Sequence, residues 1–306
     1  MSRARNLALF LVLAAVWGSA FMAIKAGLAY FPPVLFAAFR YDVAGVVMLA
    51  YAAYVVDDPI PRGRDEWAVV AVGATLIIAA YHAFLFVAET DPAVTSATAS
   101  VIVSLSPVLT TVFARVFLPS ERLTVVGVIG LLVGLIGAVV LAAPDPANLT
   151  GGGTVAKFLV FLASASFALG SVLTRASDAD ITIETMEAWS MLIGALLMHL
   201  LSAGLGESLA DVAWTTEGIA ALAYLSIAAS GLGFLIYFDL LERLGPIEIN
   251  LVSYVAPIFA AVSGWLFLSE GITPNTVAGF LIICVGFALV KRAAVRDALR
   301  EYGVAG

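Results

Sequence analysis

Hydrophobic residues fill the chain in ten long runs separated by short polar breaks. The runs cover residues 7–29, 33–55, 67–89, 92–117, 123–142, 154–176, 183–203, 214–241, 246–268 and 274–291. Each is close to the roughly 20 mostly apolar residues that a helix needs to cross the hydrocarbon core of a bilayer. The pattern therefore predicts an all-α membrane protein with ten transmembrane helices. It leaves no segment for a separate soluble domain.

The second half of the chain repeats the first. Residues 104–124 and 254–273 carry a proline, a Phe-Leu pair, a glutamate and a threonine in the same order. An offset of about 150 residues aligns several further pairs: Lys25 with Arg175, Glu89 with Asp239, Pro107 with Pro257, Glu121 with Glu270 and Thr124 with Thr273. We therefore expect two copies of a five-helix unit, residues 1–143 and 154–292, and a tail over 293–306.

The arginines of the short loops and the basic residues of the tail fall on one side of the predicted membrane. They are Arg3, Arg5, Arg62, Arg64, Arg122, Arg175, Arg243, Lys291, Arg292, Arg296 and Arg300. The breaks on the opposite side, near 30–32, 90–91, 143–153, 204–213 and 269–273, contain no Lys or Arg. Because short cytoplasmic loops carry the excess of these residues, we expect both termini in the cytoplasm and the protein in the plasma membrane.

Two copies of a unit with an odd number of spans must enter the bilayer from opposite sides. Inverted repeats of this kind are typical of secondary transporters, which bind substrate near the midplane between the halves. The pattern thus indicates a carrier of a small molecule, with or without a coupling ion. The first run follows Arg3 and Arg5 as a signal peptide would, but it belongs to the repeat, so we expect it to be retained.

Composition supports a membrane protein and narrows its chemistry. The chain is 62% hydrophobic and 12% charged with a mean hydropathy of +1.05, and its net charge of −7 does not favour nucleic acid. Cys284 is the only cysteine, and His82 and His199 are the only histidines, so a histidine-rich metal site is not expected. Phosphate-binding loops and known catalytic motifs are absent, so no cofactor and no enzyme are predicted. A membrane enzyme acting on lipid-soluble substrates and a channel stay as alternatives.

The order and duplication of these features resemble EamA-type transporters of the drug/metabolite transporter superfamily. The resemblance is carried by residues 16–21, by Arg40 and by the paired segments that end at Glu121 and Glu270. It implies two EamA domains, a central cavity lined by spans one, three, four, six, eight and nine, and frequently export of amino acids or related compounds. The chain departs from the repeat at Phe167, which stands where the first unit has Trp17.

Charged residues inside spans are costly and mark pathways or ion pairs. Trp17, Phe21 and Lys25 share one helical stripe, and Lys25 and Glu89 end near the same outer depth. One hypothesis is that Lys25 with Glu89 closes the outer mouth, while Arg175 with Asp239 closes the inner one. The alternative is that all four are snorkelling residues at helix ends.

Arg40 and His82 are the other polar candidates within the spans. Arg40 cannot pair with Asp42, two residues away, so it either receives an anionic group or bonds to carbonyls of neighbouring helices. His82 is interpreted as a neutral hydrogen-bonding residue, with proton coupling as the alternative. Glu187 is expected near the membrane interface.

Prolines inside two spans predict breaks in their hydrogen-bond ladders. Pro107 and Pro257 leave the carbonyls of Val103 and Ser253 without an amide donor. In a bilayer such groups must be satisfied by protein or by a wet cavity. We therefore expect nearby hydroxyls to line the substrate path, with a kink that those hydroxyls satisfy as the alternative: Ser104, Ser106, Thr110, Ser253 and Tyr254.

Three local signals concern helix ends, packing and modification. Thr124 and Thr273 are predicted N-caps, and Glu121 and Glu270 are expected to act on positive helix ends. A glycine stripe in the fifth span predicts close helix packing, within the chain or between two subunits of a homodimer: Gly127, Gly130, Gly134 and Gly137. Asn148 begins a glycosylation triplet in an outer loop.

Overall fold

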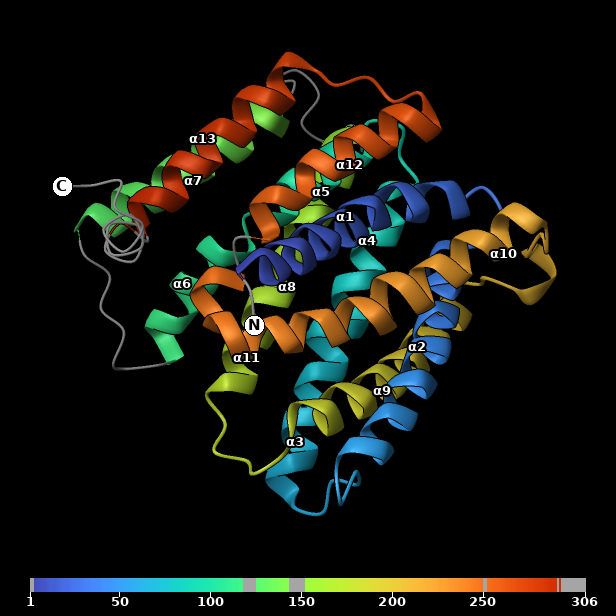
Figure 1. The fold of residues 1–306 in the computed structure, drawn as a ribbon. Coiled ribbons are helices and arrows are strands. Elements are labelled where there is room, and N and C mark those ends of the chain that lie inside the picture. The colour runs from blue at the N-terminus through green and yellow to red at the C-terminus, as the bar shows by residue number, and fades with distance from the viewer. Residues whose placement is uncertain (1–2, 118–124, 143–151, 250–251, 291, 293–306) are drawn as a thin grey trace.

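The computed structural model of the chain describes residues 3–117, 125–142, 152–249, 252–290 and 292 (Figure 1). The predicted cap at Thr124, the carboxylate of Glu121, the triplet at Asn148 and the tail over 293–306 lie outside these residues. Every regular element within the described part of the chain is helical. The protein is therefore an all-helical one.

The described helices follow one another along the chain with short connections. In order they are α1 (Arg3–Gly27), α2 (Pro33–Val55), α3 (Arg64–Val72), η1 (Gly73–Ala80), α4 (Tyr81–Glu89), α5 (Ser96–Val103), α6 (Ser106–Phe117), α7 (Val125–Ala142), α8 (Gly152–Arg175), α9 (Ile183–Gly204), η2 (Leu209–Asp211), α10 (Thr216–Ala223), η3 (Tyr224–Leu232), α11 (Gly233–Ile249), α12 (Val252–Leu268) and α13 (Pro274–Val290).

Seven helical segments of the described residues are long and apolar enough to cross a membrane. Three further apolar helices are shorter than this: Val125–Gly137, Val252–Leu268 and Pro274–Gly286. All ten coincide with hydrophobic runs of the sequence. The protein is thus a multi-pass membrane protein.

Several runs differ from single straight helices. The run 67–89 contains the π-helical segment η1, and the run 92–117 breaks between α5 and α6 at Ser104 and Leu105. The predicted break between 241 and 246 is wrong, because α11 continues to Ile249. Asp239 and Arg243 form an ion pair one turn apart on that helix. The charges therefore satisfy each other within the helix and do not mark a loop.

Helices of the first unit lie against helices of the second throughout the bundle. Figure 1 shows α2 beside α9, α1 beside α12, and α7 beside α13 at one edge, and these three pairs make the most extensive contacts between elements. The α7 and α13 helices are peripheral, as the resemblance implied for spans five and ten. The two sequence units therefore form one interleaved bundle.

Glycines set the closeness of these crossings. A Cβ atom on Gly286 would lie 2.7 Å from the carbonyl oxygen of Gly130, and one on Gly137 would lie 2.9 Å from that of Gly279. The predicted close packing of the glycine stripe is therefore found, and its partner in this structure is α13 of the same chain. Gly18 plays the same part between α1 and α12, where its Cβ would lie 2.3 Å from the Ala256 oxygen.

Carboxylates cap helices that belong to the other unit. Both oxygens of Glu270 accept the Ser96 amide at the start of α5, at 3.1 and 2.9 Å. Glu207 accepts the amides of Val34 and Leu35 at the start of α2 in the same way. Thr273 accepts the Thr276 amide at 3.1 Å, which confirms it as the N-cap of α13. Glu270 therefore acts on a helix end, as expected, although that end is in the first unit.

Candidate functional site

Two π-helical segments occupy matching positions in the two units. η1 begins at Gly73 and η3 at Tyr224, so they lie close to the repeat offset of about 150 residues. π-Helical turns are rare and are frequent at functional sites, because they displace backbone carbonyls from the regular ladder. Nothing in the hydrophobic pattern announces them, since the runs containing them stay uniformly apolar.

Side chains of the opposite unit bind these two segments. Trp17 Nε1 on α1 donates to the carbonyl of Ala229 in η3 at 3.0 Å. Ser166 Oγ on α8 donates to the carbonyl of Leu76 in η1 at 2.9 Å. Trp17 in the first unit aligns with Phe167 in the second, but the equivalent hydrogen bond is made by the hydroxyl of Ser166, one residue earlier. Each unit therefore donates a side-chain hydrogen bond to the π-helical segment of the other unit.

Arg40 lies next to η3 in the interior of the bundle. Its side chain is only 6% exposed, and its Nε donates to Ser230 Oγ at 3.0 Å. Among the described residues no carboxylate lies within ion-pair distance of it. Asp42, which points elsewhere as expected, pairs instead with His199 Nε2 on α9 at 2.7 Å. The sequence did not indicate Ser230, which lies in a run of small residues.

His82 is fully hydrogen-bonded beside Arg40. Its Nδ1 lies 2.8 Å from the carbonyl of Ile78, so this nitrogen carries the proton. Its Nε2 lies 2.7 Å from the hydroxyl of Tyr41, which then acts as donor. Both ring nitrogens are therefore hydrogen-bonded, as the interpretation from sequence expected. Tyr41 was missed, although it adjoins Arg40 in the chain.

Aromatic rings lie next to the two π-helical segments. Tyr81 and Phe167 lie 5.5 Å apart between ring centres, and Trp17 lies 5.9 Å from Phe234 and 5.4 Å from Tyr237. These five rings are only partly buried, although they lie within the spans. Phe21, also predicted to line the cavity, is 8% exposed and belongs to the core. The partly exposed rings provide apolar walls at the junction of the two units.

At one end of the bundle Lys25 holds the connection between α4 and α5. Its Nζ donates to the main-chain oxygens of Glu89, Asp91 and Val94, at 3.2, 3.3 and 2.5 Å. The carboxylate of Glu89 is not its partner. That carboxyl group is 1% exposed, and both of its oxygens are enclosed without a hydrogen bond from any described residue.

At the other end of the bundle, Arg175 and Asp239 do not form an ion pair with each other. Asp239 pairs with Arg243, and Arg175 is exposed at the end of α8. Neither ion pair of the gate hypothesis is therefore formed among the described residues in this conformation. Glu187 lies near the start of α9, and it is 8% exposed with its Oε2 enclosed and without a bond from the described residues. Helix α9 buries it because that face packs against η1 and α2.

The proline break in the first unit is satisfied by hydroxyl groups. The carbonyl of Val103, freed by Pro107, accepts Ser106 Oγ at 2.7 Å and Ser164 Oγ at 3.4 Å. Ser104 donates to Val101 and is 1% exposed. These contacts agree with the alternative that the hydroxyl groups satisfy the carbonyls at a helix kink, and they do not place Ser104 and Ser106 on an open substrate path. In the second unit Pro257 lies inside α12, with Ser253 and Tyr254 partly exposed one turn before it.

A cavity of about 390 Å³ opens between α1, α10, η3 and the end of α12. Ser19 and Tyr224 meet at its wall through a 2.6 Å hydrogen bond between their hydroxyls. Its lining does not include any of the residues predicted from sequence: Ser19, Met22, Ala23, Ala26, Glu217, Ala221, Tyr224 and Phe267. Within the described part of the chain, three or more His, Cys, Asp or Glu side chains nowhere gather as metal ligands.

Comparison with known proteins matches each half of the chain to the same family. The EamA-like transporter family matches residues 5–143 and again residues 154–292. The uncharacterized transporter YvbV of Bacillus subtilis is 29% identical over 305 residues, which cover 99% of this chain and 97% of the relative. The uncharacterized inner membrane transporter YedA of Escherichia coli K12 is 29% identical over 81% of this chain and 78% of its own length.

A solved crystal structure of another protein has the same fold. It aligns with a TM-score of 0.68 over 96% of this chain and 99% of its own, at 24% sequence identity. The match extends over both units. It therefore supports the arrangement of the helices independently of the sequence relatives.

Proposed function

Because the chain belongs to the EamA-like transporter family and is a membrane transporter, we propose that it is a secondary carrier exporting small metabolites, amino acids or related amphiphiles, by alternating access. The observation that carries the proposal is the interleaving of two repeated units around a junction that holds partly exposed aromatic rings and a buried arginine. Carriers with repeated units bind substrate at such a junction and rock one half against the other.

The contacts between helices support two equivalent units of five spans each. Exchanging the two units turns the contact of α1 with α12 into that of α8 with α5 and α6, and both contacts occur. The contact of α4 with α8 likewise corresponds to that of α11 with α1. The pairs α2 with α9 and α7 with α13 exchange with themselves. A twofold relation in the membrane plane, with ten crossings, accounts for all of these contacts.

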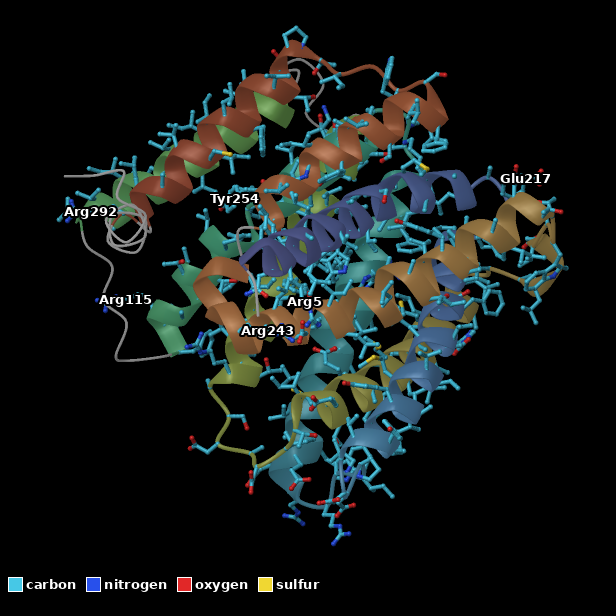
Figure 2. All side chains as sticks on the ribbon, viewed as in Figure 1. Arg5, Arg115, Glu217, Arg243, Tyr254 and Arg292 are labelled. Carbon is cyan, nitrogen blue, oxygen red and sulfur yellow. The ribbon has the colours of Figure 1, made fainter. Side chains whose placement is uncertain are left out.

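The distribution of charge supports cytoplasmic termini in the plasma membrane. In Figure 2, Glu217 at the start of α10 lies at the far right, well away from four labelled basic residues: Arg5, Arg115, Arg243 and Arg292. The arginine-rich end faces the cytoplasm by the preference of short cytoplasmic loops for basic residues. The end that holds Lys25, Glu89 and Glu217 would then face outward.

The inverted arrangement predicts opposite accessibility for equivalent loops. Single cysteines at Arg62 and Asp211, two exposed residues that correspond in the repeat, are introduced after replacing Cys284 with serine. We expect a membrane-impermeant maleimide on intact cells to label Asp211→Cys at once and Arg62→Cys only after permeabilisation. Labelling of both positions from the same side would exclude an inverted pair.

Glu89 supports a proton as the coupling ion. An ionised carboxylate that is buried without hydrogen bonds is costly, so this group is suited to carry a proton while enclosed and to release it when rocking admits water. The charged or titratable groups acting on it are Lys25, Arg40, Glu270 and Tyr81. None of them donates a hydrogen bond to its carboxylate oxygens.

A counterflow experiment tests the carrier itself. Purified protein in liposomes preloaded with one unlabelled compound is given a trace of the same labelled compound, across a panel of amino acids and amphiphilic metabolites. We expect saturable, transient accumulation of the label with at least one member of the panel. Flux that rises linearly with concentration would indicate a channel, and chemical conversion of the compound would indicate an enzyme.

A further inference from the structure

Arg40 makes few hydrogen bonds to the described protein for a buried guanidinium. A guanidinium has five N–H donors, and the bond to Ser230 Oγ uses only the Nε donor. The terminal nitrogens make no hydrogen bond among the described residues, and they are not among the fully enclosed polar atoms that lack a partner. A buried charge is normally paired or fully hydrogen-bonded. The terminal nitrogens of Arg40 therefore keep N–H donors that an acceptor can use.

The neighbours of Arg40 do not neutralise it. The Tyr41 hydroxyl is hydrogen-bonded to His82 and interacts with Ser230. The Tyr41 ring centre lies 5.2 Å from the guanidinium carbon of Arg40, so Tyr41 offers Arg40 a π face but no negative charge. Glu89 lies within electrostatic range, but no ion pair between the two is formed in the described residues. Asp42, the nearest acidic residue in the chain, pairs with His199. An anion brought by a ligand would supply what these groups do not.

From this geometry we propose that Arg40 and Ser230 form the subsite for the carboxylate of the transported molecule. The planar fork of a guanidinium matches a carboxylate with two parallel hydrogen bonds. Ser230 holds the fork through Nε and leaves the terminal nitrogens for the ligand. A single guanidinium fits one carboxylate better than a doubly charged phosphate, since no second cation is bonded at this position in the described residues.

The surroundings also select the rest of the ligand. The rings of Tyr81 and Phe167 are partly exposed, and Arg40 lies within electrostatic range of Tyr81. Aromatic walls favour an apolar or aromatic body. The molecule that fits is therefore a small carboxylate with an apolar body. A cation with the same body is expected to be rejected, because it would meet an unneutralised positive charge.

Equilibrium binding to the purified full chain tests the subsite without requiring transport. The probes are labelled phenylacetate, with phenylalanine and phenethylamine as competitors that share its ring. We expect phenylacetate to bind at about 1 mM or below, phenylalanine to compete and phenethylamine not to compete. No binding of phenylacetate at that concentration, or equal competition by phenethylamine, would overturn the proposal.

Variants locate the effect at Arg40. Arg40→Gln should weaken binding by at least about thirtyfold, and Arg40→Lys should give an intermediate loss because it keeps the charge without the fork. Ser230→Ala should cost about three- to tenfold. Arg64→Gln, at the exposed first residue of α3, is the matched control and should bind as the unmodified protein does. If Arg40→Gln melts normally and binds phenylacetate unchanged, the assignment is wrong.

The role of this subsite in transport rests on the proposed function, but binding at the subsite does not. Different results would therefore contradict each of the two. Arg40-dependent binding of phenylacetate without counterflow of any compound would retain the subsite and remove the carrier. Counterflow that persists in Arg40→Gln with an unchanged half-saturating concentration would retain the carrier and remove the subsite.

Discussion

Replacing Gly18 with leucine should leave little folded protein, with the yield of monodisperse material reduced by about tenfold or more. A Cβ atom at this position would lie 2.3 Å from the Ala256 oxygen and 2.7 Å from Phe259 Cβ on α12. The oxygen belongs to the helix backbone, so a side chain can be accommodated only if α1 and α12 separate. Because the two helices belong to different units, their separation would disrupt the interleaved bundle. Size-exclusion profiles and melting temperatures in detergent measure the effect.

Alanine at the same position gives a graded version of this test. Alanine is normally about 1 kcal/mol better than glycine inside a helix, and overpacking costs about 1–3 kcal/mol. Gly18→Ala should therefore lower the melting temperature by a few degrees despite the better helix propensity. Gly204→Ala is the control, since nothing lies within 4 Å of its added Cβ. Equal melting temperatures for the two variants would show that the close approach of α1 to α12 does not matter.

Replacing Glu89 with glutamine should abolish accumulation driven by a pH gradient while leaving counterflow in place. The amide keeps the shape of the buried carboxyl group but cannot take up or release a proton. The variant should then equilibrate its substrate but no longer concentrate it. The substrate concentration ratio across the membrane should fall by about tenfold for each ~1.4 kcal/mol of proton gradient that no longer drives transport. The measurement compares the final substrate ratio across proteoliposomes with and without an imposed gradient, using a compound that shows counterflow.

An exposed carboxylate provides the control for this change. Asp178→Asn alters an exposed residue between α8 and α9 and should keep the coupled accumulation of the unmodified protein. Should Glu89→Gln still concentrate substrate under the gradient, the proton would have to be carried elsewhere, and buried Glu187 would be the next group to replace. Loss of counterflow as well, in a variant that melts normally, would make Glu89 part of substrate binding and not of coupling.

Within the candidate site, sequence reasoning found single residues but not their partners. Arg40 and His82 stood out because polar side chains are rare in apolar runs. Ser230 and Tyr41 did not, since a serine among small residues and a tyrosine in a helix are unremarkable until folding brings them to Arg40 and His82. The duplicated π-helical segments were invisible for a related reason. Their carbonyls accept hydrogen bonds from Trp17 and Ser166, which come from the other unit.

The sequence alone determined the membrane class, the positions of the apolar helices, the duplication and the N-cap at Thr273, because hydropathy, repetition and capping are local properties of the chain. Only the tertiary structure decided which groups meet. Lys25 binds main-chain oxygens and not the Glu89 carboxylate, Glu270 caps a helix of the first unit, and the glycines of α7 meet α13. These contacts join residues far apart in the chain, and they depend on how two interleaved units dock, which no local pattern records.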